Sequence, residues 1–308
     1  MKQVVSVSLG SAAGDFVREV TLAGQLVRLS REGTGGDMAR ARARIQELDG
    51  KVDALGLGGI DIYLAVSGQR FVIGDGLRLA EAATRTPVVD GSGLKNTLER
   101  DVVRALASRG LVTPETKVLM VSALDRFGMA EAFVELGCPC VFGDLIFNIG
   151  LDFPLTVLTE IEQLAQKYRS RLLTTPFHQL YPTGAAQDAP EADPRYAKYY
   201  EAADAIAGDG HLILCHLPSR AEGKGIVTNT TRPQSMARFQ AAGIRWVATT
   251  TPEMDGLSGG TNLMEAALVA LMEKPLAEIT PQDYEDWIKR LGWHGAVHMF
   301  GDKETEAR

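Results

Sequence analysis

Residues 117–144 constrain the fold of this chain more than any other stretch. The run 118–121 is continuously apolar (VLMV), which is typical of a parallel strand buried on both faces. Residues 127–136 then repeat apolar side chains at helical spacing, and Gly137 stands where the helix should end. A second apolar run follows at 140–142. The pattern predicts a β-α-β unit of an open parallel sheet.

The turn after the first strand is where such a unit would bind nucleotide phosphates. The dinucleotide motif G-x-G-x-x-G is incomplete here, because with Gly128 as its third glycine the first two positions are Ala123 and Asp125. Asp125 adds bulk and negative charge where a pyrophosphate must approach, and Arg126 offsets only the charge. Asp144 follows Ala123 by 21 residues, close to the spacing of a carboxylate that binds the ribose of NAD. Its alternative is an exposed loop carboxylate.

Length and composition are those of an ordinary soluble globular protein. The 308 residues suggest two domains, and 45% of the residues are hydrophobic and 23% charged. A net charge of −7, without a basic run, argues against nucleic acid or an anionic membrane as partner. The N-terminus alternates apolar residues with serine and predicts a strand, not a signal peptide. With only three cysteines, we expect a reduced protein of the cytoplasm.

The fold class predicted from the remaining periodicity is α/β, in three parts. Residues 1–93 should form a strand-rich N-terminal α/β domain with two hairpins, on the substrate side of the molecule. Asp37 should cap a helix there that runs to about Leu48. Residues 94–275 should form a Rossmann-like domain, a doubly wound parallel sheet in which strands and helices alternate. Residues 276–308 should form a C-terminal helix and a tail. In the second of these parts, residues 172–175 are predicted as a strand, and residues 177–194, which hold three prolines, as a long loop.

Polar residues gather at the carboxyl ends of the predicted strands, where ligands bind in open parallel sheets. The same polarity is expected of loops in a protein without a site. The set is Ser122, Asp125, Arg126, Asp144, Asp209, Asn229, Thr230, Thr249, Thr250, Thr251 and Glu253.

Two further stretches have the composition of a binding site. Residues 258–262 (SGGTN) open a predicted helix, whose free backbone N–H groups favour an anion; the alternative is a helix N-cap at Thr261. His211, Cys215 and His216 resemble metal ligands in composition only. In a strand His216 would point away from the other two, and we predict no metal site.

Two stretches resemble the shikimate/quinate 5-dehydrogenase superfamily, including bacterial proteins labelled quinate 5-dehydrogenase. The turn DGSG at 90–93, followed by a helix and by KVLMVSA, resembles the linker and cofactor domain of that family. The run GGTNLMEAALVALM at 259–272 resembles its substrate-contacting helix, with Glu265 at the position of the family's glutamine. The chain departs from the family in lacking the N-V-T-x-P-x-K motif that supplies the catalytic lysine.

The resemblance implies an NAD(P)-dependent oxidoreductase acting on the hydroxyl of a small polyhydroxylated carboxylic acid. It implies Asp90 as a catalytic residue, and we take Lys95 as the missing lysine, with Lys51 as second choice; such a pair can relay the alcohol proton as hydride leaves. The alternative for Asp90 is a turn carboxylate that accepts its own backbone N–H groups. Asn262 and Glu265 would contact substrate. The residues expected at NAD or NADP are Ser122, Asp125, Arg126, Phe127, Gly128, Asp144 and Thr250.

Two other functions stay open. The absent lysine motif and Asp125 favour a non-catalytic small-molecule binding or sensing protein on a dehydrogenase-derived fold. The hairpin-rich start and the run LGLGGID at 55–61 loosely resemble an actin-like phosphotransferase. In each case the expected partner is a small molecule and neither nucleic acid nor a membrane, and a homodimer is left open.

Overall fold

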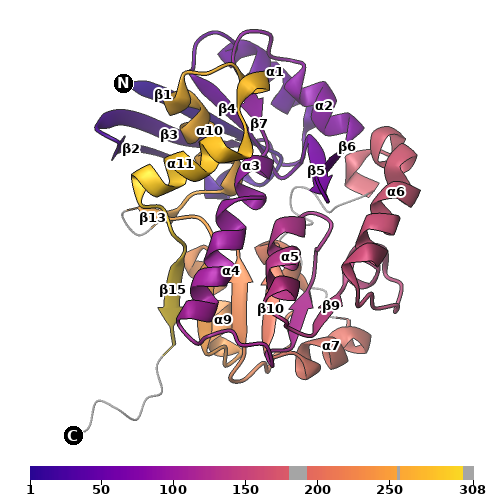
Figure 1. Cartoon of the computed structure of the whole chain (residues 1–308). Coiled ribbons are helices and arrows are strands. Elements are labelled where there is room, and N and C mark those ends of the chain that lie inside the picture. The colour runs from indigo at the N-terminus through magenta and orange to yellow at the C-terminus, as the bar shows by residue number, and fades with distance from the viewer. Residues whose placement is uncertain (180–192, 255–256, 301–308) are drawn as a thin grey trace, which may run out of the picture.

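The computed structural model describes residues 1–179, 193–254 and 257–300, and it is an α/β protein with two mixed, mostly parallel sheets (Figure 1). The α/β class predicted from the sequence is confirmed at this level. The predicted division at residues 93 and 275 stays a prediction. Most of the loop predicted at 177–194 lies outside the described residues.

The first sheet has the strand order β2-β3-β1-β4-β7, and all neighbours are parallel except β2 and β3. Its register places Ser8, Gly33 and Gly58 side by side at the carboxyl ends of three parallel strands. The strands are β1 (Lys2–Ser8), β2 (Phe16–Leu22), β3 (Gln25–Gly33), β4 (Ala54–Gly58) and β7 (Val88–Val89).

Smaller elements surround this sheet. Helix α1 (Met38–Leu48) begins after Asp37, whose carboxylate accepts the backbone N–H of Arg40 at 2.9 Å, as the sequence predicted. The second predicted hairpin is present as β5 (Tyr63–Val66) and β6 (Gln69–Val72), and helix α2 (Gly74–Ala80) follows it.

The second sheet has the order β15-β12-β11-β10-β8-β9, parallel except for β15. Side chains alternate along its strands: Val118 and Met120 belong to one buried cluster, whereas Leu119 belongs to another. Both faces are therefore covered, as the apolar runs predicted. The strands are β8 (Val118–Met120), β9 (Cys140–Phe142), β10 (Ala205–Gly208), β11 (Gly225–Thr228), β12 (Trp246–Thr249) and β15 (Ala296–Met299).

Helices cover the two faces. Helices α4 (Leu98–Ser108) and α5 (Phe127–Glu135) lie side by side in front of the second sheet (Figure 1). Side chains from α7 (Ala197–Ala202), α8 (Gly210–His216) and α9 (Pro233–Ala241) pack in the cluster behind it.

Three local predictions were wrong. Residues 172–175 were predicted as a strand, but helix α6 (Leu158–Thr174) continues through most of them. Residues 90–93 were predicted as a turn that precedes a helix, but the short helix α3 (Ser92–Lys95) already includes Ser92 and Gly93. The C-terminal range was predicted as a helix and a tail, and it holds in addition a strand that was not predicted, since β15 pairs antiparallel with β12. Its four residues are half-buried or exposed, so they carry too little apolar pattern to indicate a strand.

The C-terminal helices return to the first sheet. Helix α10 (Thr261–Met272) packs on β4 and β1, and α11 (Pro281–Leu291) lies beside it, although both follow the second sheet in sequence (Figure 1). Glycine makes this close approach possible, because a Cβ at Gly56 would lie 2.8 Å from the carbonyl oxygen of Asn262.

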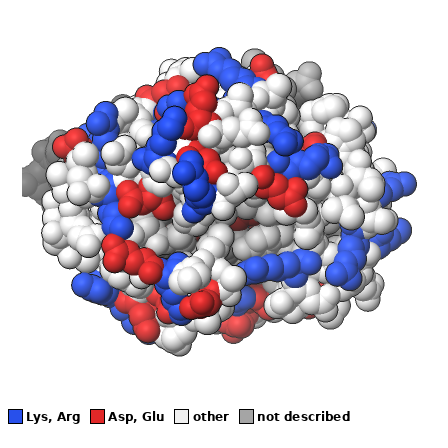
Figure 2. All heavy atoms as spheres, turned by 90° about the horizontal axis from the view of Figure 1, so that it is seen from above, with Lys and Arg blue, Asp and Glu red and all other residues white. Residues whose placement is uncertain are grey.

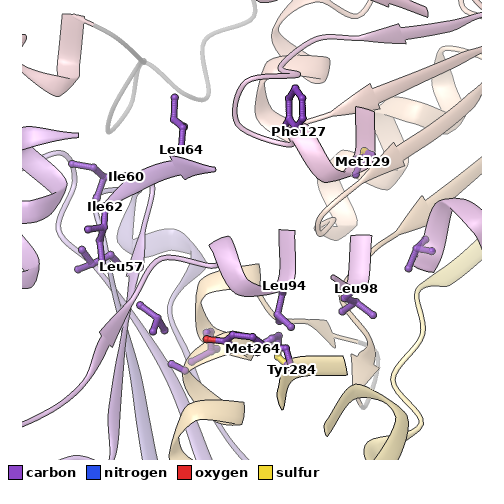
Figure 3. Close-up of a cluster of buried hydrophobic side chains, with 14 of the residues drawn as sticks. Leu57, Ile60, Ile62, Leu64, Leu94, Leu98, Phe127, Met129, Met264 and Tyr284 are labelled. Carbon is purple, nitrogen blue, oxygen red and sulfur yellow. The ribbon is translucent and has the colours of Figure 1, made fainter. Parts of the chain in front are cut away.

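One buried apolar cluster connects the two halves. Figure 3 shows Leu94 and Leu98, on α3 and α4, gathered near Met264 of α10 and Tyr284 of α11. On the face seen in Figure 2, basic and acidic side chains are interspersed. Of the helices within the described ranges, none has both the length and the apolar character needed to cross a bilayer.

Candidate functional site

A cleft of about 950 Å³ lies where the carboxyl ends of the two sheets meet. Its polar lining comes from both halves of the chain. Ser6, Ser8 and Asp61 come from the first half, and Ser122, Asp209 and Asn229 from the second.

The strand order of each sheet explains why a cleft forms there. In the second sheet the strand order reverses at β8, which has β9 on one side and β10 on the other, and such a reversal leaves a crevice outside the strand ends. Ser122 follows β8 and Asp209 follows β10, and the Asp209 N–H donates to the Ser122 hydroxyl at 3.1 Å. In the first sheet β1 has β3 on one side and β4 on the other, so Ser8 stands at an equivalent point.

Lys95 joins the two halves in the cleft. Its ammonium donates to Asp61 at 2.6 Å and to Asp125, and the residue is only 6% exposed. Burial lowers the pKa of Lys95, but the two carboxylates outweigh burial and hold that pKa above its usual range. Burial likewise raises the pKa of Asp125, but Lys95 and Arg126 hold it below its usual range. Asp125, whose bulk and charge would obstruct a phosphate in this turn, is therefore one of the two carboxylates that Lys95 bridges.

Arg126 extends this network. Its guanidinium contacts Glu99 and lies 3.6 Å from a carboxylate oxygen of Asp209. Burial raises the pKa of Glu99 to about 7 despite Arg126. Thr250 donates to the Glu99 oxygen that faces Arg126, at 3.4 Å, and the other oxygen has no partner among the described residues.

The residues predicted to meet NAD or NADP have partners within the protein, and the cofactor itself stays a prediction. Asp144 is 2% exposed, and its two oxygens accept the N–H groups of Ala123 and Leu124 at 3.0 and 2.9 Å. Burial raises the pKa of Asp144 to about 6. This carboxylate lines the cleft, and both of its oxygens are engaged in holding the turn. Gly128 serves helix packing, because a Cβ there would lie 2.7 Å from the carbonyl oxygen of Lys95.

Two other residues of the predicted cofactor set are buried inside the protein. Phe127 lies in the apolar core, and Thr250 is fully buried beside Glu99. Ser122, Asp125 and Arg126 do line the cleft, where Ser122 accepts the Asp209 N–H and the other two belong to the network of Lys95.

Asp90 and Lys95 do not pair with each other, as the proposed proton relay requires, because each has other partners. Asp90 accepts from the backbone of Ile62 at 2.7 Å and of Ser92 at 3.0 Å, and from the Ser92 hydroxyl. It is the turn carboxylate of the alternative interpretation. Lys95 pairs with other carboxylates, and its raised pKa makes it a poor base. Lys51 is exposed and does not line the cleft.

Of the two residues predicted to contact substrate, only Asn262 lines the cleft. Asn262 lines the cleft and donates to the Ser6 hydroxyl at 2.6 Å. Glu265 lies outside it, where it accepts from Gly93 N–H at 3.1 Å and from the Tyr284 hydroxyl at 2.7 Å. Burial raises the pKa of Glu265 to about 7. Glu265 therefore ties α10 to α3 and α11.

The two stretches with a site-like composition also differ from their predictions. The N-cap of α10 is Gly260, and the Thr261 hydroxyl is buried without a partner among the described residues. His211 to His216 are helical in α8, which is capped by Asp209, rather than extended. Within the described part of the chain, no three His, Cys, Asp or Glu side chains are grouped so that they could hold a metal.

Several residues of the cleft were not predicted. Asp61 follows β4, so the strand-end rule applied to the run LGLGGID could have found it. Arg31, inside β3, carries no such signal, because only the packing of distant segments places it here. The same is true of Glu99, inside α4, which is buried behind the lining against Arg126.

The comparisons with known proteins give families without a described activity. A family model described as "Domain of unknown function (DUF8754)" matches residues 93–300, and one described as "Domain of unknown function (DUF8753)" matches residues 3–90. No curated protein matches the chain.

Solved structures with some likeness include solute-binding proteins. One is an ABC transporter solute binding protein from Burkholderia multivorans, with 13% identity and a TM-score of 0.39 over 97% of this chain and 99% of that one. Another is a sugar ABC transport system substrate-binding protein from Bordetella parapertussis, with 12% identity and a TM-score of 0.39 over 100% and 92%. A third is the periplasmic binding protein of the arabinose ABC transporter of Shewanella, with 10% identity and a TM-score of 0.36 over 94% and 95%. Likeness at this level carries no argument about what this chain binds.

The assignment to the shikimate/quinate 5-dehydrogenase superfamily, and with it the oxidoreductase activity, is wrong. The matching family models are described as domains of unknown function, and Lys95 pairs with Asp61 and Asp125 instead of with Asp90. The predicted cytoplasmic location is likewise not retained.

Proposed function

The chain belongs to the family described as Domain of unknown function (DUF8754), which brings no activity with it, and from the geometry of the cleft we propose that it binds a small polyhydroxylated molecule. The observation that carries this proposal is the paired polar lining of the cleft, with fixed groups from both halves of the chain.

The chemistry of the lining suits hydroxyl groups. Asp61 and Asp209 offer carboxylate acceptors, whereas the amides of Asn229 and Asn262 offer a donor and an acceptor each. Leu57 belongs to the apolar part of the lining, which suits the C–H face of a sugar or inositol ring. A volume of about 950 Å³ accommodates a ligand of this size.

Rigidity favours binding at this place. Lys95 and Arg126 hold the surrounding carboxylates, so the lining is ordered before a ligand arrives and binding costs less entropy. The parallel strands β9-β8-β10-β11-β12 also have the order of a doubly wound, Rossmann-like sheet, whose reversal point is a usual ligand site. The cofactor predicted from the sequence has no part in this proposal.

The test is a ligand panel of pentoses, hexoses, inositols and the corresponding sugar acids. We expect at least one compound to raise the melting temperature, because a ligand at 100 times its Kd stabilises the folded state by about 2.7 kcal/mol. Calorimetry should then show that Asn229→Ala weakens binding. Gln240→Ala is the matched control, since its amide is exposed on α9 away from the cleft. A panel that yields neither a thermal shift nor binding heat would overturn the proposal.

A further inference from the structure

Two arginines from opposite walls of the cleft meet beside Gly14. Arg31 comes from β3, and Arg232 stands immediately before α9. A Cβ built on Gly14 would lie 2.7 Å from a terminal nitrogen of Arg232 and 3.2 Å from one of Arg31. Both residues line the cleft, so two guanidinium groups occupy one corner of it.

Positive charge in this corner is not balanced. Arg31 pairs with Asp15 at 2.8 Å and also donates to the Ser8 hydroxyl at 3.0 Å. Arg232 forms no ion pair with any residue in the described part of the chain. Of the two guanidinium groups, only that of Arg31 is therefore paired with a carboxylate in the described part of the chain.

Two further effects make the arrangement costly without a counter-ion. Burial, and then the charge of Arg232, lower the pKa of Arg31. Arg232 is also the N-cap of α9, at the positive end of the helix dipole, where a cation is disfavoured. An anion in the corner would relieve both effects.

We propose that the Arg31–Arg232 corner binds an anionic group, a carboxylate or a phosphate, of the molecule that occupies the cleft. This inference rests on the proposed function, since it names the charge of the same ligand. Guanidinium groups bind both anions through two parallel hydrogen bonds, and one from each wall would hold the two halves of the chain together. The Lys95–Arg126 network is unsuited to an anion, because four carboxylates face its two cations there.

The experiment compares matched ligand pairs on the full chain by calorimetry: glucose with glucuronate and glucose 6-phosphate, and galactose with galacturonate. We expect the acid or the phosphate ester to bind at least about tenfold more tightly than the neutral sugar, as bonds to a charged group imply. The two ligand types distinguish a carboxylate from a phosphate. Inorganic phosphate alone should compete with the anionic ligand only.

The variants separate charge from folding. Arg232→Gln should lower the affinity for the anionic ligand at least about tenfold more than the affinity for the neutral sugar, and so remove the preference, whereas Arg232→Lys should keep part of it. Arg245→Gln, at an exposed arginine outside the cleft, should change neither. Circular dichroism would establish that each variant is folded. Equal affinity for acid and neutral sugar in the unaltered protein, with no effect of Arg232→Gln, would overturn the inference and leave the proposed function standing. Absence of binding for every compound would overturn both.

Discussion

Lys95 is the cation that bridges two carboxylates from different halves of the chain. Replacing it with methionine would leave Asp61 and Asp125 buried side by side without this bridge, although Asp125 would keep Arg126 at 3.5 Å. Because a buried charge without a partner is costly, we expect Lys95→Met to lower the free energy of unfolding by about 3 kcal/mol or more. Urea denaturation measures the change. Lys198→Met breaks an ion pair with Asp152 whose side chains are 56% and 42% exposed, and should have far less effect. Similar values for the two variants would contradict the bridge.

Glu99 gives the stability a pH dependence with a defined sign. Burial raises its pKa from the usual 4.5 to about 7, so the folded protein keeps this proton to higher pH than the unfolded chain does. Its contribution is full below pH 4.5 and is lost as the pH rises through 7. Glu99→Gln imitates the protonated group, and we expect it to reduce the loss of unfolding free energy between pH 5 and pH 8, on the order of 2 kcal/mol.

Urea denaturation of both proteins at the two pH values provides the measurement. Glu265, with its pKa at about 7, contributes in the same direction, so the variant should keep part of the slope. Parallel pH profiles for Glu99→Gln and the unaltered protein would show that Glu99 is charged throughout.

For single residues, the sequence reveals which side chains stand at the strand ends but not which partners they have. The strand-end rule selected Ser122, Asp125, Asp209 and Asn229, and all four line the cleft. It could not distinguish Asp125, which pairs with a lysine 30 positions away, from Asp144, which binds the backbone of its own turn. The environment of each carboxylate depends on segments that meet only in the folded chain.

At the scale of elements, Gly128 decides how closely α5 approaches the backbone of Lys95 and Asn96, at the end of α3. A methyl group there would meet the carbonyl oxygen of Lys95 at 2.7 Å and the Cα of Asn96 at 3.1 Å. Gly128→Ala should therefore lower the free energy of unfolding by about 1–3 kcal/mol, although alanine is the better helix former. Thermal unfolding provides the comparison with Val134→Ala, on the exposed side of the same helix, which we expect to stay within about 0.5 kcal/mol. A stabilised Gly128→Ala would mean that α5 is not held by this contact.

Elements with a strong period were predictable, and those defined by their neighbours were not. The alternation of β2 and β3 and the capping box of Thr280 and Asp283 before α11 are local patterns, and the structure contains both. Residues 172–175 have the composition of a strand, but they continue an established helix, where Thr174 bonds back to the Ser170 carbonyl at 2.9 Å. β15 exists because β12 offers an edge to pair with, which no local pattern could show.

At the scale of the whole molecule, the two halves share their elements. The chain leaves the first sheet through α3 and α4, returns to it with α10 and α11, and leaves it again for β15 (Figure 1). The cleft between the sheets is thus built on segments that belong to one half by sequence and to the other by packing. Binding and folding of the two halves should be coupled for this reason.

A fragment experiment tests that coupling. Residues 1–96 contain the entire first sheet but lack α10, which covers β1 and β4, so we expect this fragment alone to remain unfolded. Joining it by a short Gly/Ser linker to residues 259–292 should restore folding. The two segments are close, because a Cβ on Gly91 would lie 3.0 Å from the backbone nitrogen of Asn262. Far-UV circular dichroism during urea denaturation should show a cooperative transition for the fusion and none for residues 1–96. A cooperative transition in the isolated fragment would mean that α10 does not complete the first core, and that each half folds independently of the other.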